Sequence, residues 1–234
     1  MNLTSDASTD DRLERVMKLF RFLAATVLLA TSIPTALADA RSEAFVDANA
    51  NSVLSVLNDR SLSAEAREKK FRDYMNSFAN MPSIARRVIG VKARTLSDAD
   101  FNRFFSIFET YALQVYQVHF DQFRGEALRV TGSKDDGPQR STVESIIRSS
   151  QTGKDTRVFW DVLLSNDGKS YRVRDVGLEL GGSVLWLAQE QQAQFVSFLD
   201  RNGGDIDKLI GRINVLLDDM EARKKDGRGS AYKG

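Results

Sequence analysis

The apolar positions of residues 43–124 recur with the period of about 3.6 residues that is typical of amphipathic helices. This pattern predicts a short helix over residues 45–57 and a second helix after Ser63, whose hydroxyl can cap its first turn. A third short helix is expected to open at Ser83 and to end at Gly90, since glycine suits the left-handed position that follows a helix.

A long fourth helix is predicted over residues 98–123. Ser97 and Asp100 have the spacing of a capping pair at its start, and Gly125 follows it as a stop. Its apolar face is broad and rich in aromatic side chains, consisting of Phe101, Phe104, Phe105, Phe108, Tyr111, Ala112, Val115 and His119.

From residue 128 onward the apolar period changes from about 3.6 to 2, which indicates strands. Leu128 and Val130 begin a first strand, and residues 132–138 read as a turn-rich linker. Further strands are expected around residues 141–148, 158–164 and 171–180, with a hairpin signal between the last two. The pattern predicts an antiparallel meander.

The apolar phase slips within the last of these strands. Tyr171 and Val173 fall on one phase, whereas Val176 and Leu178 fall on the other. Because side chains alternate faces along a strand, this slip predicts a β-bulge near residues 175–177.

Two helices are expected to close the chain. Residues 181–183 turn into a helix that carries Leu185, Trp186 and Phe195, and a last helix is capped by Asp205. Residues 222–234 form a basic tail that we expect to be disordered. The order of elements predicts an α+β fold, with N-terminal helices and one or two C-terminal helices packed on one face of a curved antiparallel sheet of about four or five strands.

The beginning of the chain has the pattern of an export signal. Lys18 and Arg21 precede the apolar residues 22–30, a run too short to span a bilayer. Small residues with the spacing that a signal peptidase accepts follow at Ala36, Ala38 and Ala40. The alternatives are an uncleaved membrane anchor and a buried helix.

The signal pattern divides the chain into residues 1–40, an upstream extension with a cleavable signal peptide, and residues 41–221, a single domain. The sixteen residues before Met17 contain four acidic side chains, which do not suit the start of a signal peptide, so we expect translation to begin at Met17. The mature protein is then expected to begin at Asp39 or Arg41 and to be periplasmic.

Charge and composition narrow the chemistry of the mature chain. The full chain has 33 basic and 32 acidic side chains, of which residues 1–40 hold four and five. The mature chain therefore keeps 29 basic and 27 acidic side chains. A nearly balanced charge gives no electrostatic reason to expect nucleic-acid binding. There is no cysteine, which excludes thiol chemistry and disulfides. One histidine, His119, leaves little room for a histidine-based hydrolase or metal site, and no cofactor or metal is expected.

The chain resembles the MlaC, or toluene-tolerance, family of periplasmic lipid-binding components of an ABC transport system. The likeness extends from Phe45 to about Leu216 and depends on the order and spacing of several short pieces. These are residues 84–90, residues 104–116 with the following Phe123-Arg124-Gly125, Tyr171-Arg172-Val173-Arg174-Asp175-Val176, Gly182-Ser183, Gln194-Phe195, and Gly203-Gly204 before Leu209-Ile210.

The resemblance implies a periplasmic carrier that binds phospholipid, or a related lipid such as a hopanoid, in an apolar pocket between the helices and the sheet. It also implies a monomer that docks transiently to an inner-membrane ABC transporter complex and to an outer-membrane lipoprotein complex. Two departures from the family pattern bear on specificity. Tyr171 stands where the family commonly has tryptophan, and the glutamine-rich residues 189–192 replace an arginine.

The residues expected to line this pocket come from the apolar faces of two helices, the strands, and the segment after the glycine turn. They are Phe71, Tyr74, Phe104, Phe108, Tyr111, Tyr116, Val158, Trp160, Val162, Tyr171, Val173, Val176 and Leu185. For any one of them the alternative is ordinary core packing. Asp175, at the predicted bulge, is expected to cap backbone amides rather than to act in catalysis.

Two other functions are compatible with the sequence. A hydrolase would use Ser183 and His119, but Gly182-Ser183 lacks the Gly-x-Ser-x-Gly context of a nucleophile elbow. An exported structural or adaptor protein would have a fully packed core and no ligand. Lipid that remains bound after purification would distinguish the carrier from the adaptor.

Overall fold

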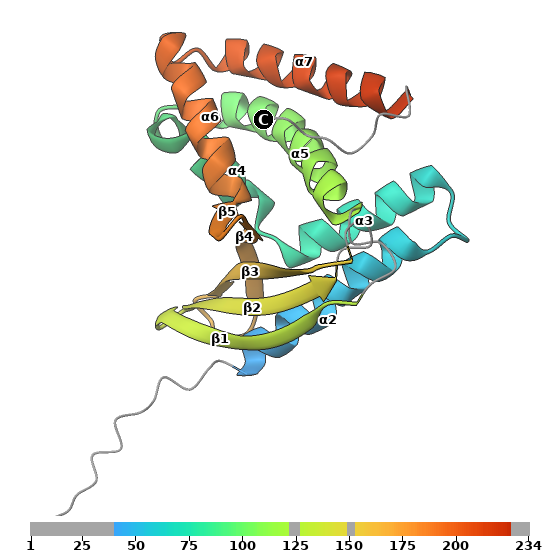
Figure 1. Cartoon of the computed structure of the whole chain (residues 1–234). Helices are drawn as coiled ribbons and strands as arrows, with labels where there is room; N and C mark the ends of the chain where they lie inside the picture. The colour runs from blue at the N-terminus through green and yellow to red at the C-terminus, as the bar shows by residue number, and fades with distance from the viewer. Residues whose placement is uncertain (1–39, 122–126, 149–152, 226–234) are drawn as a thin grey trace, which may run out of the picture. The chain divides into compact units, whose positions relative to one another are not determined.

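The computed structural model describes residues 40–121, 127–148 and 153–225, all within one compact unit that spans residues 36–234. These residues form a mixed helix and sheet fold (Figure 1), which confirms the predicted fold class. The elements in chain order are α2 (Ala40–Asn58), α3 (Ala64–Phe78), α4 (Met81–Val88), the 3₁₀ helix η1 (Gly90–Arg94), α5 (Asp98–Asp121), β1 (Arg129–Gly137), β2 (Arg140–Arg148), β3 (Asp155–Leu164), β4 (Tyr171–Leu180), β5 (Ser183–Trp186), α6 (Leu187–Arg201) and α7 (Ile206–Lys225). In these ranges no helix combines the length and the apolar character needed to cross a membrane.

The sheet is an antiparallel meander in the order β1-β2-β3-β4-β5. Asp161 on β3 faces Asp175 on β4, and the next pair along is Val162 with Val173, so Arg174 is an extra residue on β4. The predicted bulge is therefore present, one residue before the expected position. It places Tyr171 and Val173 on the same face as Val176, which explains the change of apolar phase.

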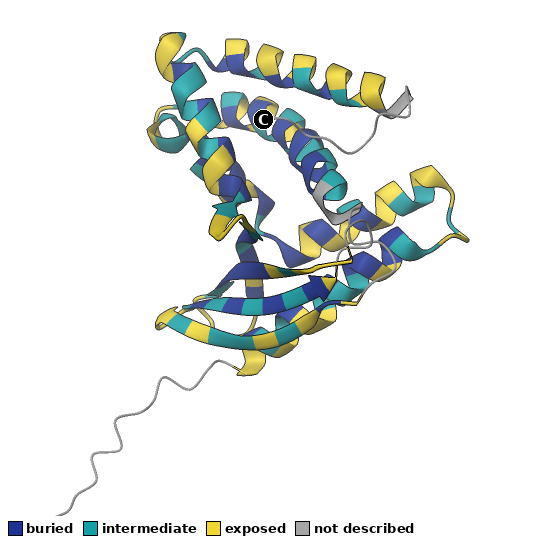
Figure 2. Ribbon diagram, viewed as in Figure 1, coloured by how far each residue is buried: buried dark blue, intermediate teal, exposed yellow. Residues whose placement is uncertain are grey.

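The helices cover the sheet in two groups. α2 and α3 pack against each other, with α2 on β1 and β2 and α3 on β4, while α4 and α6 also contact β4. α5 packs against α4 and α7. Figure 2 shows buried positions along α5 and exposed positions along the outer side of α7. A continuous hydrophobic core joins buried residues of α2 to α7 with those on the inner face of the sheet.

The predicted helix caps are present. The Ser63 hydroxyl accepts a hydrogen bond from the Ala66 amide at 3.1 Å, and the Ser97 hydroxyl accepts one from the Asp100 amide at 3.1 Å. At α7, an Asp205 carboxylate oxygen accepts from the amides of the second and third helical residues at 2.9 and 3.2 Å. Each cap satisfies amides that have no partner within the helix.

Two helices differ from their predicted bounds at the N-terminal half of the chain. α2 has 19 residues rather than being short. α4 begins at Met81 rather than at Ser83, because the Asn80 side chain caps it by accepting from the Ser83 amide at 3.1 Å. Pro82 then falls in the first turn, where its missing N–H would have no partner.

Two parts of the sheet were predicted wrongly. Residues 132–137 belong to β1 rather than to a linker, because their backbone pairs with β2 while Lys134 and Asp136 face the solvent. Leu185 and Trp186 lie in β5 rather than in a helix. Gly181 and Gly182 have φ values of 58° and 82°, which suit a two-residue hairpin turn and return the chain beside β4.

The ends of the chain are only partly described. α7 continues to Lys225, past the expected start of the disordered tail at residue 222, and residues 226–234 lie outside the described ranges. The predicted signal peptide also lies outside them, since the described residues start at Ala40. The same holds for Phe123 and Gly125, the expected end of α5.

Candidate functional site

A largely enclosed cavity lies where the corner between α3 and α4 meets α5 and the inner face of the sheet. Its volume is about 10 Å³, roughly the space that one water molecule needs. The wall is apolar except at Tyr116 and Asp175. It is formed by Met75, Phe78, Ala79, Ile84, Tyr116, Trp160, Val173, Asp175 and Val176.

Four of the predicted pocket residues line this cavity, namely Tyr116, Trp160, Val173 and Val176. Trp160 is fully buried, its ring centroid is 5.6 Å from that of Phe78, and its Nε1 donates to the Ser145 hydroxyl at 2.9 Å. The sheet and the α3–α4 corner thus meet through aromatic side chains.

The other predicted pocket residues lie elsewhere. Phe108 and Tyr111 contact Phe195 of α6, with ring centroids 6.3 and 5.9 Å apart, so this stretch of the aromatic face of α5 packs one helix on another. Leu185 is half-buried in β5. The remaining buried members of the predicted set are Phe71, Phe104, Val158, Val162 and Tyr171.

Tyr74 points away from the core, with 38% of its surface exposed. It lines an open groove of about 620 Å³ between α2 and α3. A second open groove, of about 540 Å³, runs along α6 beside Gln192 and Val196. Both grooves are open and contain two or more charged side chains, whereas the cavity is largely enclosed and has one, Asp175.

The sequence interpretation missed five residues of the cavity wall. Phe71, Met75 and Phe78 are the buried residues of α3, and their helical spacing is the signal that could have found Met75 and Phe78. No sequence pattern marks Ala79 as a wall residue, because its position is set by an isolated β-bridge that pairs its backbone with that of Val173. The remaining two are Ile84 and Asp175.

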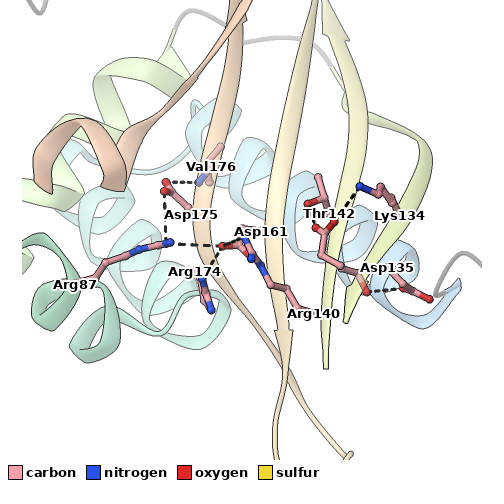
Figure 3. A network of polar contacts seen from close by, with 11 residues as sticks. Arg87, Lys134, Asp135, Arg140, Thr142, Asp161, Arg174, Asp175 and Val176 are labelled. Atoms are coloured by element: carbon pink, nitrogen blue, oxygen red, sulfur yellow. Dashed lines mark hydrogen bonds and ion pairs between the residues drawn. The ribbon is translucent and has the colours of Figure 1, made fainter. Parts of the chain in front are cut away.

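Asp175 contributes a carboxylate to the cavity wall, and Figure 3 shows its contacts with Val176 and Arg87. One carboxylate oxygen accepts from the amides of Val176 and Ala188 at 2.9 and 2.8 Å, which confirms the expected capping role and ties β4 to the start of α6. The other oxygen, Oδ2, is buried without a hydrogen-bond partner among the described residues. It lies 3.7 Å from Nη1 of Arg87.

Asp161, the cross-strand neighbour of Asp175, is the centre of a charged cluster that Figure 3 shows. Arg140 donates to both of its carboxylate oxygens, at 2.8 and 3.3 Å, and Arg174 lies 3.1 Å away. Arg87 Nη1 is more distant, at 3.8 Å. Two buried carboxylates directly opposite each other would repel, and the three guanidinium groups offset that repulsion.

The surroundings of Asp175 shift two pKa values. Burial raises the pKa of Asp175 to about 6, although the Ala188 and Val176 amides and the charge of Arg87 act in the opposite direction. Asp161 raises it further. Burial also raises the pKa of Tyr116, with a smaller contribution from the charge of Asp175.

Acidification should reveal the raised pKa of Asp175 in the stability of the protein. Burial disfavours the ionised carboxylate in the folded state only, and this lowers the stability of the folded protein above pH 6. The loss of stability becomes smaller as the pH falls from 6 toward 3.8, the pKa of Asp175 in the unfolded chain. Between pH 7.5 and 5, the free energy of unfolding of the wild type should rise by roughly 1 kcal/mol relative to Asp175→Asn. Asparagine keeps an oxygen acceptor for the two amides and does not titrate. Urea denaturation at both pH values measures this difference, and a constant difference would contradict the assignment.

The other candidate groups do not assemble a catalytic site in the described residues. Ser183 is exposed at the start of β5, and the side chain of His119 lies outside the described residues. Arg157 on β3 is paired with Glu144 at 2.8 Å and Glu179 at 3.4 Å.

Comparison with solved structures shows a related fold. A phospholipid-binding protein from Ralstonia solanacearum, crystallised with a phospholipid, aligns with a TM-score of 0.62 and 16% sequence identity. The alignment covers 74% of this chain and 94% of that protein. A comparison with curated proteins gives no significant match.

The sequence itself matches a family model. The model described as MlaC protein covers residues 47–215, which include every element from α2 to α7 at least in part. The chain therefore belongs to the MlaC family.

Proposed function

We propose that this protein is a non-catalytic lipid carrier that binds phospholipid at the cavity between the α3–α4 corner, α5 and the sheet. The observation that carries the proposal is an enclosed, mostly apolar cavity at this interface, in a chain of the MlaC family whose fold is shared with a protein crystallised with a phospholipid. A related lipid such as a hopanoid would suit the same apolar wall.

The physical need for such a site follows from the cost of exposing an acyl chain. Each CH₂ group is worth about 0.8 kcal/mol, so a chain of some sixteen carbons costs roughly 12 kcal/mol to expose to water. Ligand pockets typically have volumes of about 300–1,000 Å³. The cavity of about 10 Å³ is far smaller, so we infer that lipid binding separates the helices from the sheet.

The route of the lipid is part of the proposal. After export and cleavage of its signal peptide, the mature protein acts as a periplasmic monomer that moves lipid between an inner-membrane ABC transporter complex and an outer-membrane lipoprotein complex. Membership of the MlaC family supports this route.

Mass spectrometry of an organic extract tests the function most directly. The protein, expressed with its signal region and purified without detergent, is expected to carry phospholipid in a defined molar ratio. Protein without bound lipid that also takes up none from phospholipid vesicles would favour the alternative of an exported adaptor with a packed core.

The two tryptophans allow the binding site to be located. Trp160 lines the cavity, whereas Trp186 lies in β5 with its ring near Phe159, at a centroid distance of 6.4 Å. Phospholipid with brominated acyl chains should quench the fluorescence of Trp160 in the variant Trp186→Phe, because bromine quenches tryptophan on close contact. The matched variant Trp160→Phe reports Trp186 and should be quenched much less. Equal quenching of the two, or quenching of Trp186 alone, would place the acyl chains elsewhere.

A further inference from the structure

Arg87 joins a helix to the charged cluster of the sheet. It belongs to α4, whereas Asp161, Asp175, Arg140 and Arg174 belong to strands (Figure 3). Its Nη1 atom lies 3.8 Å from Asp161 and 3.7 Å from Asp175, and 28% of its side chain is exposed. Separation of α4 from β3 and β4 would therefore lengthen both of these ion pairs.

The contacts within the cluster differ in strength. Arg140 and Arg174 approach Asp161 to 2.8 and 3.1 Å and are contributed by strands next to β3. Arg87 Nη1 and Asp175 Oδ2 are buried, and neither has a hydrogen-bond partner in the described ranges. Asp161 would thus keep its two close partners if Arg87 moved away, and the pairs made by Arg87 are the ones that can separate with little other rearrangement.

The same ion pairs lie beside the cavity. Ile84, three residues before Arg87 on α4, lines one side of the cavity, and Asp175 lines another. The start of α4 is attached to the sheet through the backbone, since the Asn80 amide donates to the Val173 carbonyl at 3.1 Å. α4 is held near its start by this hydrogen bond and near its end by Arg87.

We propose that the ion pairs of Arg87 with Asp161 and Asp175 are a clasp that favours the closed cavity and separates when lipid enters. The inference depends on the proposed lipid binding and adds to it a positioning residue that sets the balance between the closed and the lipid-filled protein. A ligand that binds only the open form must overcome the closing free energy, so a weaker clasp gives tighter apparent binding.

The equilibrium partition of brominated phospholipid between vesicles and the protein measures this balance through the fluorescence of Trp160 in a Trp186→Phe background. Arg87→Gln removes the charge and should raise the partition constant roughly fivefold. Arg87→Lys retains the charge and should return the constant toward that of the parent. The matched control is Arg86→Gln, whose guanidinium is exposed on the same helix and lies over the Phe101 ring at 3.8 Å. It should leave the constant unchanged.

The outcomes separate this inference from the proposed function. If the parent takes up no lipid, the proposed function fails and the clasp fails with it. If the parent binds lipid and Arg87→Gln, shown to be folded by its circular dichroism and cooperative melting, has the same or a lower partition constant, the clasp alone is overturned. An equal increase in Arg86→Gln would also overturn it, because the effect would then follow from the loss of any arginine on α4.

Discussion

Replacement of Asp161 by alanine should lower the free energy of unfolding by about 3 kcal/mol. The Asp161 side chain is 2% exposed and is the common ion-pair partner of Arg140 and Arg174, which lie within 3.1 Å of it. Without it, three guanidinium groups face one another beside a single remaining carboxylate, Asp175. The loss is expected at the lower end of the range for broken buried ion pairs, because the arginines are exposed enough to recover part of their hydration.

Urea denaturation of the wild type and Asp161→Ala provides the measurement. Asp136→Ala is the matched control, since Asp136 lies on the edge strand β1 of the same sheet, pairs with Lys134 at 3.4 Å and accepts from the Thr142 hydroxyl at 2.5 Å. That change should cost about 1 kcal/mol, as one surface ion pair and one hydrogen bond contribute less than a buried charged cluster. Similar losses in the two variants would contradict a special role of the buried cluster.

Replacement of Val173 by tryptophan should remove the lipid that co-purifies with the protein. Val173 is buried, lines the cavity, and is held in place by the hydrogen bond from Asn80 to its carbonyl. A cavity of about 10 Å³ cannot accommodate an indole ring, so the ring must wedge between the sheet and the helices, where the acyl chain is proposed to lie. Overpacking is expected to cost about 1–3 kcal/mol while the fold remains cooperative.

Lipid content and melting temperature, measured on the same sample, test this expectation. Ile147→Trp is the control, because Ile147 is buried on the same face of the sheet and does not line the cavity. Ser141 on β2 pairs with Val162, and Val162 pairs with Val173, so these three residues form one row across the sheet. Ile147 lies six residues along β2 from Ser141, which is about 20 Å from that row along the strand direction. The control should lose stability and keep its lipid. Wild-type lipid content in a folded Val173→Trp would contradict the placement of the ligand.

Most of the secondary structure could be predicted from local patterns in the sequence. The caps at Ser63, Ser97 and Asp205 were predictable, because a capping side chain acts on amides two or three residues away. The slip of apolar phase around Arg174 was likewise visible, since a bulge moves every following side chain to the other face. Such features depend on neighbours in the sequence and leave a direct trace in it.

The errors in the sheet occurred where pairing determined the structure. The polar residues 132–137 have little strand character of their own and become part of β1 because β2 offers hydrogen-bond partners. β5 forms because two glycines with positive φ return the chain to β4, where Gly177 leaves room for Trp186. Neither the partner strand nor the space beside Gly177 can be read from a periodic pattern.

By itself, the sequence determined the fold class, the order of most elements, and the family, because periodicity, capping and motif spacing are local properties. It also supplied Tyr116, Trp160, Val173 and Val176 of the cavity wall. Only the tertiary structure decided which members of the apolar faces meet at the cavity, since all core residues look alike in a hydrophobic pattern and their partners depend on how the layers pack. The approach of Arg87 to Asp161 and Asp175 was decided in the same way, by the packing of α4 beside the bulge.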